Sequence, residues 1–126
     1  MTNLRELATV APRTIWKGVT ARIVRGERIT MAINELDPGT LVPEHRHESE
    51  QLGIALIGAV TFTAGAETER LGPGGTWRIL GGIPHSALAG PEGAVVLDVF
   101  SPVRTDWDEL DTEATRPPIW PAGRSR

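Results

Sequence analysis

Short apolar runs separated by turn residues fill most of the chain. Val19–Arg25 and Arg28–Leu36 predict two strands, and Gly26-Glu27 between them fits a hairpin turn. Further runs of strand-like composition are Leu52–Ile57, Val60–Ala64, Thr76–Leu80, His85–Ala89 and Ala94–Phe100. Glycine- and proline-rich breaks recur roughly every 8–12 residues, which is typical of a β-sandwich or barrel. We therefore expect an all-β fold.

The two ends of the chain follow a different pattern. A short helix is expected around Asp106–Glu113, and the prolines after it predict an extended arm. The first dozen residues predict either a further strand or a second arm. The sequence shows no internal repeat and no second hydrophobic unit, so residues 1–126 are interpreted as a single domain.

Composition narrows the classes of function. With no cysteine, the chain has no disulfide and no thiolate metal ligand. The net charge is -3 and the charges are scattered, whereas a nucleic-acid-binding protein usually carries a basic stripe. No apolar run approaches the roughly 20 residues that span a bilayer, and the first residues do not resemble a signal peptide. We expect a soluble cytoplasmic protein that binds neither nucleic acid nor membrane.

The three histidines of the chain carry the strongest chemical signal. In a strand, His45 and His47 point to the same face, and Gln51 shares their parity if the strand pairing is continuous. His85 begins a later run, after a tight Gly-Gly-Ile-Pro turn. A single histidine is more often a surface or core residue, and one His-x-His pair is a modest signal. His45, His47, Gln51 and His85 are therefore the candidate ligands of one divalent metal ion per chain.

The spacing around these residues resembles the two motifs of the cupins. The first motif is matched over residues 39–58 by Gly39, His45, His47, Gln51 and Gly58, and the second over residues 74–85 by Gly74, Gly81, Gly82, Pro84 and His85. Gln51 stands where most members carry glutamate, Leu80 replaces the usual proline, and the asparagine that follows the histidine is missing. The resemblance covers about 29–102. It implies a double-stranded β-helix, or jelly-roll barrel, with a metal site.

A glutamine ligand changes the charge of the expected site. Three neutral imidazoles and an amide oxygen leave the ion with its full charge, which makes it a stronger Lewis acid. Zn, Ni, Co, Fe and Mn all accept such ligands, so the metal stays open. The flanking Glu44, Glu48 and Glu50 are interpreted as solvated residues at the mouth. For Glu50 to be a ligand, the strand register would have to slip.

The same parity predicts which side chains line the barrel. Gly53, Ala55 and Ile57 are expected to face inward with Gln51, and Ala87 and Ala89 to face inward with His85. These residues are mostly small and leave space above the metal. The alternate residues Leu52, Ile54 and Leu56 then face outward and need cover. A partner subunit or the terminal arms would supply it, and we expect a homodimer.

Asp98 interrupts the most apolar run, AVVLDVF, and shares a face with Val96 and Phe100. If that face lines the barrel, a carboxylate is buried there and must pair, become protonated or act on a substrate. The alternative is an outward-facing Asp98 that bonds to backbone groups.

A narrower resemblance surrounds Asp98. Residues 98–107 are similar to the end of the cupins of pectin and alginate breakdown that linearise 4,5-unsaturated monouronates. That resemblance implies a substrate pocket lined by Asp98, Phe100 and Arg104, and a metal set of three histidines and one glutamine. The gap between His47 and Gln51 is often one residue longer in those proteins. Polyketide cyclases with related sequences also exist, in which the glutamine position can hold a fourth histidine.

These observations favour a metal-dependent enzyme without redox chemistry. The metal would polarise a hydroxyl or carbonyl of a small oxygen-rich substrate, and Asp98 would move the proton. Arg104 would bind a carboxylate or enolate, with Phe100 and Trp77 as pocket walls. For Trp77, plain packing in the core is an equal alternative to a role as a pocket wall. Competing functions are a polyketide cyclase, an Fe-dependent dioxygenase and a non-enzymatic small-molecule-binding cupin.

Overall fold

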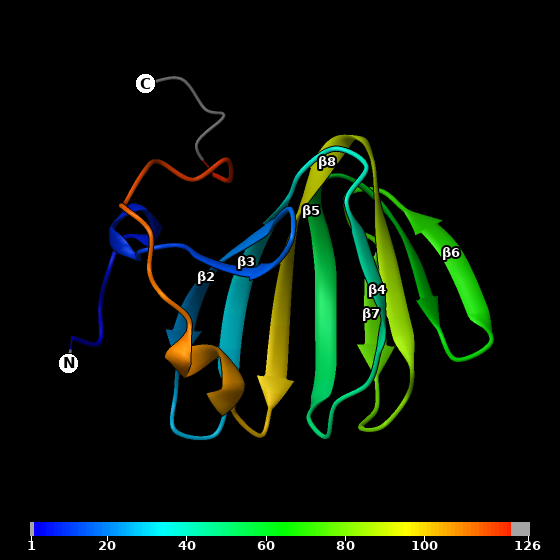
Figure 1. Cartoon of the computed structure of the whole chain (residues 1–126), viewed down its shortest axis with the longest axis horizontal. Coiled ribbons are helices and arrows are strands. Elements are labelled where there is room, and N and C mark those ends of the chain that lie inside the picture. The colour runs from blue at the N-terminus through cyan, green and yellow to red at the C-terminus, as the bar shows by residue number, and fades with distance from the viewer. Residues whose placement is uncertain (1, 122–126) are drawn as a thin grey trace.

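A computed structural model describes residues 2–121 and consists mainly of antiparallel strands (Figure 1). The strands are β1 (Arg13–Trp16), β2 (Val19–Arg25), β3 (Thr30–Leu36), β4 (Leu41–His45), β5 (Glu50–Ala64), β6 (Glu67–Leu71), β7 (Thr76–Ile79) and β8 (His85–Ser101). Two 3-10 turns, η1 (Leu7–Thr9) and η2 (Thr105–Glu109), lie outside the sheet. The expectation of an all-β fold is confirmed. Within residues 2–121, no helix has the length and hydrophobicity needed to cross a membrane.

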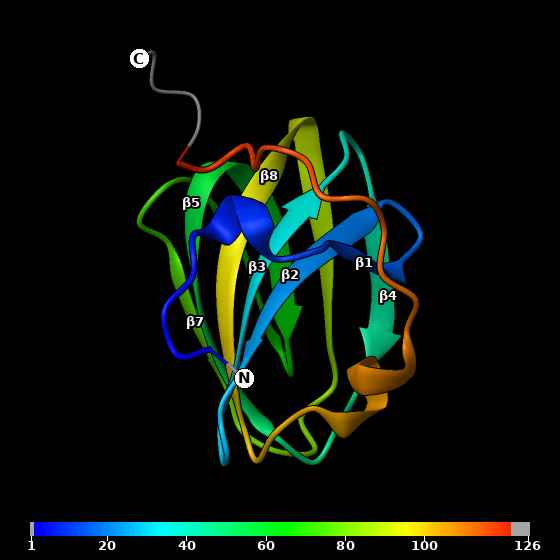
Figure 2. The same cartoon turned by 90° about the vertical axis from the view of Figure 1, so that its left-hand side faces the viewer.

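Two long strands, β5 and β8, build the barrel. They pair from Glu50 opposite Ser101 to Ala64 opposite His85. The first part of β5 also pairs with β7, and the last part of β8 also pairs with β3. The remaining part of β5 pairs with β6, and the remaining part of β8 pairs with β4. β2 and then β1 extend the sheet beyond β3. Because β5 and β8 run through both layers, the sheet folds over on itself as a jelly roll (Figures 1 and 2).

A bend at Gly58 lets both long strands cross from one layer to the other. The register shifts between Ala55 and Ile57, and again between Gly58 and Val60. Gly58 has a φ of 74°, and a Cβ there would overlap the carbonyl oxygen of Gly93, so only glycine fits. The expected separate runs 52–57 and 60–64 are therefore one strand, as are 85–89 and 94–100. The first shift also turns Ile57 outward, where it is 37% exposed, so its expected inward position is wrong.

Further elements differ from the sequence prediction, β1 among them, because the sequence predicted no strand over Arg13–Trp16. β6 was not predicted, because Glu67–Leu71 has no apolar face and takes its strand form from pairing with β5. The helix expected at Asp106–Glu113 is the shorter 3-10 turn η2, which Leu110 ends in extended conformation. β3 begins at Thr30, two residues later than expected.

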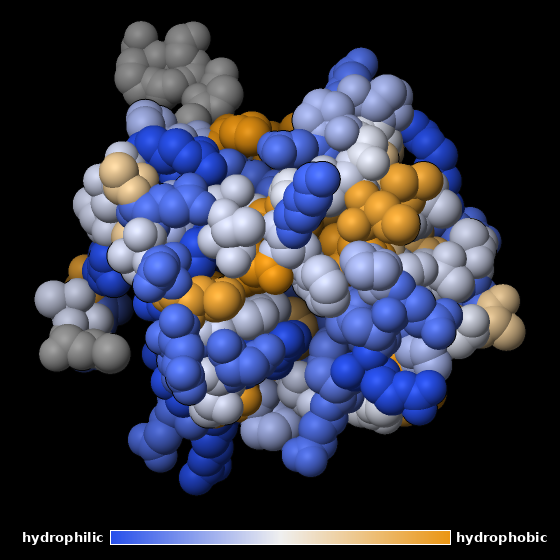
Figure 3. All heavy atoms as spheres, in the orientation of Figure 1, coloured by the Kyte–Doolittle hydropathy of each residue, from blue (hydrophilic) through white to orange (hydrophobic). Residues whose placement is uncertain are grey.

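The core lies between the two layers. The larger cluster of buried side chains contains Val19, Leu36, Val42, Ala55, Val60, Trp77, Ile79, Ala87, Ala89, Ala94 and Val96. A smaller cluster joins Ala32 and Phe100 to Trp107 of η2. Leu52 is 51% exposed on the outer side of β5, as the parity predicted. Leu41 and Leu88 are paired and also exposed, and Figure 3 shows hydrophobic groups over this part of β4 and β8.

The C-terminal arm is fixed to the outside of β2 and β3 (Figure 2). Buried Glu35 pairs with buried Arg22 and with Arg116, both at 3.0 Å, and accepts the N–H of Ile119 at 2.9 Å. Burial raises the pKa of Glu35, but the bonds from Ile119 and Arg116 outweigh it and leave the pKa below its usual value. The arm is therefore held by a charged network rather than by apolar packing alone.

Candidate metal centre

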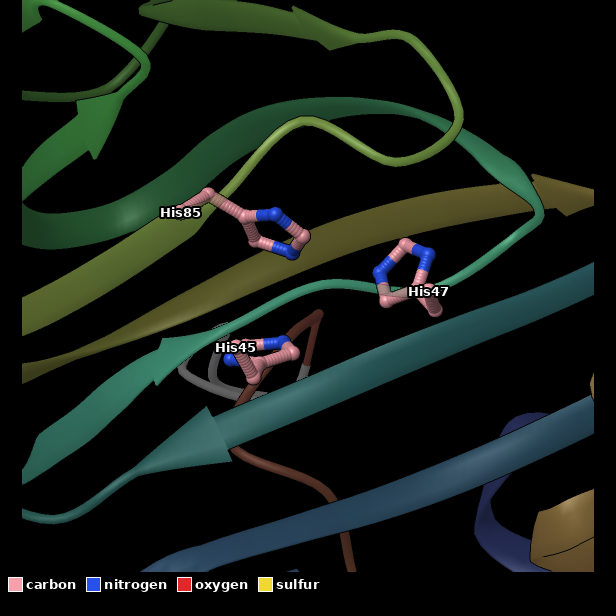
Figure 4. A group of neighbouring side chains, drawn as sticks. All are labelled: His45, His47 and His85. Carbon is pink, nitrogen blue, oxygen red and sulfur yellow. The ribbon is translucent and has the colours of Figure 1, made fainter.

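The three histidines converge from three places in the chain (Figure 4). His45 ends β4, His85 begins β8 opposite it, and His47 lies in the loop that leads to β5. One ligand nitrogen from each ring lies within 4.8 Å of the others. The premise of one continuous strand from His45 to Gln51 is wrong, because β4 ends at His45. The loop turns His47 toward the other two rings instead.

Each imidazole has one ring nitrogen bonded to a backbone carbonyl. The Nδ1 atoms of His45, His47 and His85 lie 2.8–2.9 Å from the carbonyl oxygens of Pro43, Ser49 and Ile83 respectively. A carbonyl oxygen can only accept, so each Nδ1 carries the proton. The lone pair is then on Nε2, which is the arrangement that backbone carbonyls impose on metal-binding histidines.

Gln51 supplies a fourth donor atom. It is the second residue of β5, and its Oε1 lies 3.2 Å from Nε2 of His47. Both atoms carry lone pairs, so a cation between them is favourable whereas direct contact is not. Nε2 of His85 is buried and receives no hydrogen bond within residues 2–121. This donor set of three nitrogens and one oxygen fits a divalent transition metal, which His45, His47, Gln51 and His85 would hold.

Asp98 fixes the orientation of Gln51. It faces the barrel interior, is 5% exposed, and its Oδ1 accepts hydrogen bonds of 2.8 Å from Gln51 Nε2 and Trp77 Nε1. Its Oδ2 accepts a third bond of 2.8 Å from Asn34 Nδ2. Because a carboxylate only accepts, the amide of Gln51 must turn its oxygen away, toward the histidines. Gly53 makes this possible, since a Cβ there would overlap both Trp77 and Asp98.

Burial dominates the electrostatics of the site. It raises the pKa of Asp98 above its usual value, although the bonds from Gln51, Trp77 and Asn34 oppose the rise. It lowers the pKa of His85 to about 4, against the opposing bond from the Ile83 carbonyl, and it also lowers the pKa of His47. Both imidazoles are therefore neutral at neutral pH, which is the form that binds metal.

Aromatic side chains form the walls of the cavity around these groups. The Trp77 ring stacks on Phe62 with 4.8 Å between centroids, and Phe100 meets His47 edge-on at 5.7 Å. Trp16 of β1 lies 5.0 Å from His45. Phe100 and Trp77 were expected as pocket residues, whereas Trp16 and Phe62 were missed. Trp16 lies in a segment for which the sequence predicted no element, and Phe62 has the pattern of an ordinary core residue.

Arg104 lies at the same cavity, in the turn before η2. Its guanidinium carbon is 4.1 Å from the centroid of Trp107 and 4.9 Å from that of Phe100. Its Nε and one terminal nitrogen donate to the two carboxylate oxygens of Asp106, at 3.0 and 2.8 Å. The side chain is only 13% exposed, so the cation is held in place rather than free in solvent.

The three glutamates beside the ligands lie outside the centre. Glu44, Glu48 and Glu50 are exposed, whereas Gln51 is buried. The register that places Gln51 rather than Glu50 inside is fixed by the pairing of Gln51 with Phe100. This agrees with their interpretation as solvated residues.

Comparison with known proteins places this geometry in a family. Residues 32–100 match the cupin domain, which is more than half of the chain. The structure of KdgF from Halomonas sp. is 28% identical, covers 75% of this chain and 88% of that chain, and has a TM-score of 0.71. An RmlC-like cupin from Shewanella frigidimarina has a TM-score of 0.79 over 85% of this chain and 96% of that one; at 18% identity it supports the fold alone.

A further similar structure is that of oxalate decarboxylase from Bacillus subtilis at pH 4.6. It is 27% identical over 76% of this chain with a TM-score of 0.68, and this chain spans 28% of its length. Another structure of that enzyme concerns its Mn(II) centres. The comparison with curated proteins gives no match. The domain match, the jelly-roll topology and the histidine cluster agree, and the chain belongs to the cupin family.

Proposed function

We propose that this cupin is a metal-dependent isomerase that opens the ring of 4,5-unsaturated monouronates. The observation that carries the proposal is the content of one cavity: three imidazoles, an amide oxygen, the carboxylate of Asp98 and the guanidinium of Arg104. Similarity to KdgF, a uronate-linearising cupin, supports the same substrate class.

The net reaction needs no co-reactant. The C1 hydroxyl loses its proton, the C1–O5 bond breaks to give a C1 aldehyde and a C5 enolate, and the enolate becomes a ketone by gaining a proton at C4. Atoms and electrons balance within the substrate, so the proposed chemistry is proton transfer without redox. A bound divalent metal would supply Lewis acidity to a substrate oxygen.

Arg104 binds the substrate carboxylate in this proposal. Asp106 occupies Nε and one terminal nitrogen of Arg104, so the other terminal nitrogen remains to donate. The rings of Phe100 and Trp107 hold the guanidinium plane. A cation fixed in this way loses little side-chain freedom when an anion binds, which favours binding.

Asp98 is the proposed proton carrier. It lines the cavity beside Gln51, and no other carboxylate of residues 2–121 does so. Its carboxylate also holds Gln51 in place, so its removal would affect both proton transfer and the orientation of Gln51.

We further propose that the protein is cytoplasmic and forms a homodimer through its exposed apolar strand faces, of which Leu52 is one part.

The direct test is turnover of 4,5-unsaturated galacturonate under anaerobic conditions. The absorbance of the conjugated C4=C5 carboxylate should disappear with the protein loaded with Zn, Ni, Mn or Fe, and persist with the chelated protein. Turnover only with Fe and oxygen would replace the proposal by a dioxygenase. Turnover of a polyketide and not of the uronate would indicate a cyclase, and binding without turnover a non-enzymatic cupin.

A further inference from the structure

Asn34 has an unused hydrogen-bond acceptor inside the barrel. It is 5% exposed and lines the same cavity as the histidines. Its Nδ2 donates to Asp98, but its Oδ1 is buried and accepts no hydrogen bond from any group of residues 2–121. A buried acceptor without a donor is costly, so native structures rarely keep one without a reason.

The orientation of this amide is fixed by its partner. Oδ2 of the ionised Asp98 only accepts, and its donor is the NH₂ group of Asn34, so Asn34 cannot exchange its oxygen and nitrogen without losing that bond. The neighbours of Asn34 on the same face of β3, Ala32 and Leu36, belong to the core clusters. The face therefore points into the barrel, and Oδ1 is held there as an acceptor.

Asp98 thus turns two amide oxygens away from itself by the same means. Its Oδ1 orients Gln51, whose oxygen lies beside His47, and its Oδ2 orients Asn34. The first oxygen belongs to the candidate metal centre. The second has no such neighbour and is suited to a hydroxyl donor on a bound molecule.

We propose that Asn34 is a substrate-binding residue whose Oδ1 accepts a hydrogen bond from a ring hydroxyl. This rests on the proposed function, and it makes the preferred ligand a hydroxylated carboxylate: Arg104 takes the carboxylate and Asn34 takes a hydroxyl. An aromatic ligand without a hydroxyl at that point would leave Oδ1 buried and unpaired. Asn34 therefore contributes to discrimination between a uronate and an apolar ring.

The test is calorimetric titration of the zinc-loaded protein with D-galacturonate and with its 2-deoxy and 3-deoxy analogues. These saturated acids bind without the ring-opening reaction, so the result does not depend on turnover. Asn34→Leu removes the acceptor at similar size. Thr63→Val is the matched control, because the Thr63 hydroxyl pairs with Thr68 away from the cavity.

We expect Asn34→Leu to bind galacturonate about tenfold more weakly, which corresponds to about 1.4 kcal/mol, and Thr63→Val to bind as wild type does. One deoxy analogue should bind wild type about tenfold more weakly than galacturonate, and this difference should disappear in Asn34→Leu. Metal content and melting curves of each variant establish that the site is intact.

The proposal is overturned if wild type does not bind galacturonate, or if neither deoxy analogue binds more weakly. Absence of turnover with intact galacturonate binding would instead defeat the proposed reaction alone. Should Asn34→Leu not fold, a crystal structure of wild type with zinc and galacturonate decides. A hydroxyl within about 3.2 Å of Oδ1 supports the proposal, and all hydroxyls placed elsewhere overturn it.

Discussion

Replacing Asp98 by Asn separates its proposed proton transfer from its structural role. The asparagine keeps the size of the side chain, and its Oδ1 still accepts from Gln51 and Trp77. Its new NH₂ group faces the NH₂ of Asn34, so the amide of Asn34 must turn over and accept instead. All three contacts then survive in neutral form.

The magnitude follows from these contacts. Hydrogen bonds to a charged group contribute about 1.5–3 kcal/mol and neutral ones about 0.5–1.5, while loss of the buried charge removes a desolvation cost. The two effects oppose each other, so Asp98→Asn should change the free energy of unfolding by at most about 2 kcal/mol. Metal content should stay near wild type, because Gln51 keeps its orientation. Proton transfer contributes about 10²–10⁴-fold, and kcat should fall by that factor.

Steady-state kinetics on the unsaturated uronate, with metal analysis and a melting curve, measures all three quantities. Trp77→Phe is the matched control: it removes one hydrogen bond to Asp98 but keeps the carboxylate and the ring on Phe62, so kcat should fall less than about tenfold. Because Asn34 turns over in Asp98→Asn, only a loss beyond that of Asn34→Leu is assigned to the proton. Wild-type turnover in Asp98→Asn would refute the reasoning, and loss of metal would show that the carboxylate charge is needed at the centre.

Three further predictions concern packing, pH and assembly. Gly53→Ala places a Cβ against Trp77 and Asp98 and should cost about 1–3 kcal/mol of stability and most of the activity, whereas Gly72→Ala, with open space, should be neutral in melting and kinetic assays. Glu35→Gln should cost about 3 kcal/mol at pH 7. Since the folded pKa of Glu35 is lowered, this stability is present above its unfolded pKa and is lost as pH falls through the folded value. A loss of stability in Glu35→Gln, measured by denaturation, that is equal at pH 7 and pH 3 would contradict this prediction. Light scattering should give a dimer mass at micromolar concentration, and a monomer mass would exclude the proposed homodimer.

Much of the candidate site was predicted from the sequence. His45, His47 and His85 lie together as expected, although the loop after β4, and not strand alternation, brings His47 to the other two rings. Asp98 faces inward because it keeps the parity of Phe100 in an uninterrupted part of β8. Alternation failed at Ile57, where a β-bulge adds a residue and reverses the facing. A bulge depends on the partner strand, so the local pattern does not reveal it.

The hydrogen-bond network around Asp98 could not be predicted from the sequence. Gln51 of β5, Trp77 of β7 and Asn34 of β3 meet on Asp98 of β8 only because β3 and β5 flank β8 and β7 pairs with β5. One signal was nevertheless present: Asn34 occupies a position of β3 between Ala32 and Leu36, both of which face the core. A polar residue on the core-facing side of a strand is a candidate for a buried hydrogen bond or for contact with a ligand.

Metal analysis of the unchelated protein, combined with X-ray absorption spectroscopy, tests the metal centre most directly. We expect one ion per chain, surrounded by three imidazole nitrogens and one amide oxygen at roughly 2.0–2.3 Å for a zinc-like ion. His85→Ala should lose the stoichiometric metal while the control Thr63→Val retains it. No stoichiometric metal in wild type, or unchanged metal content in His85→Ala, would contradict the account.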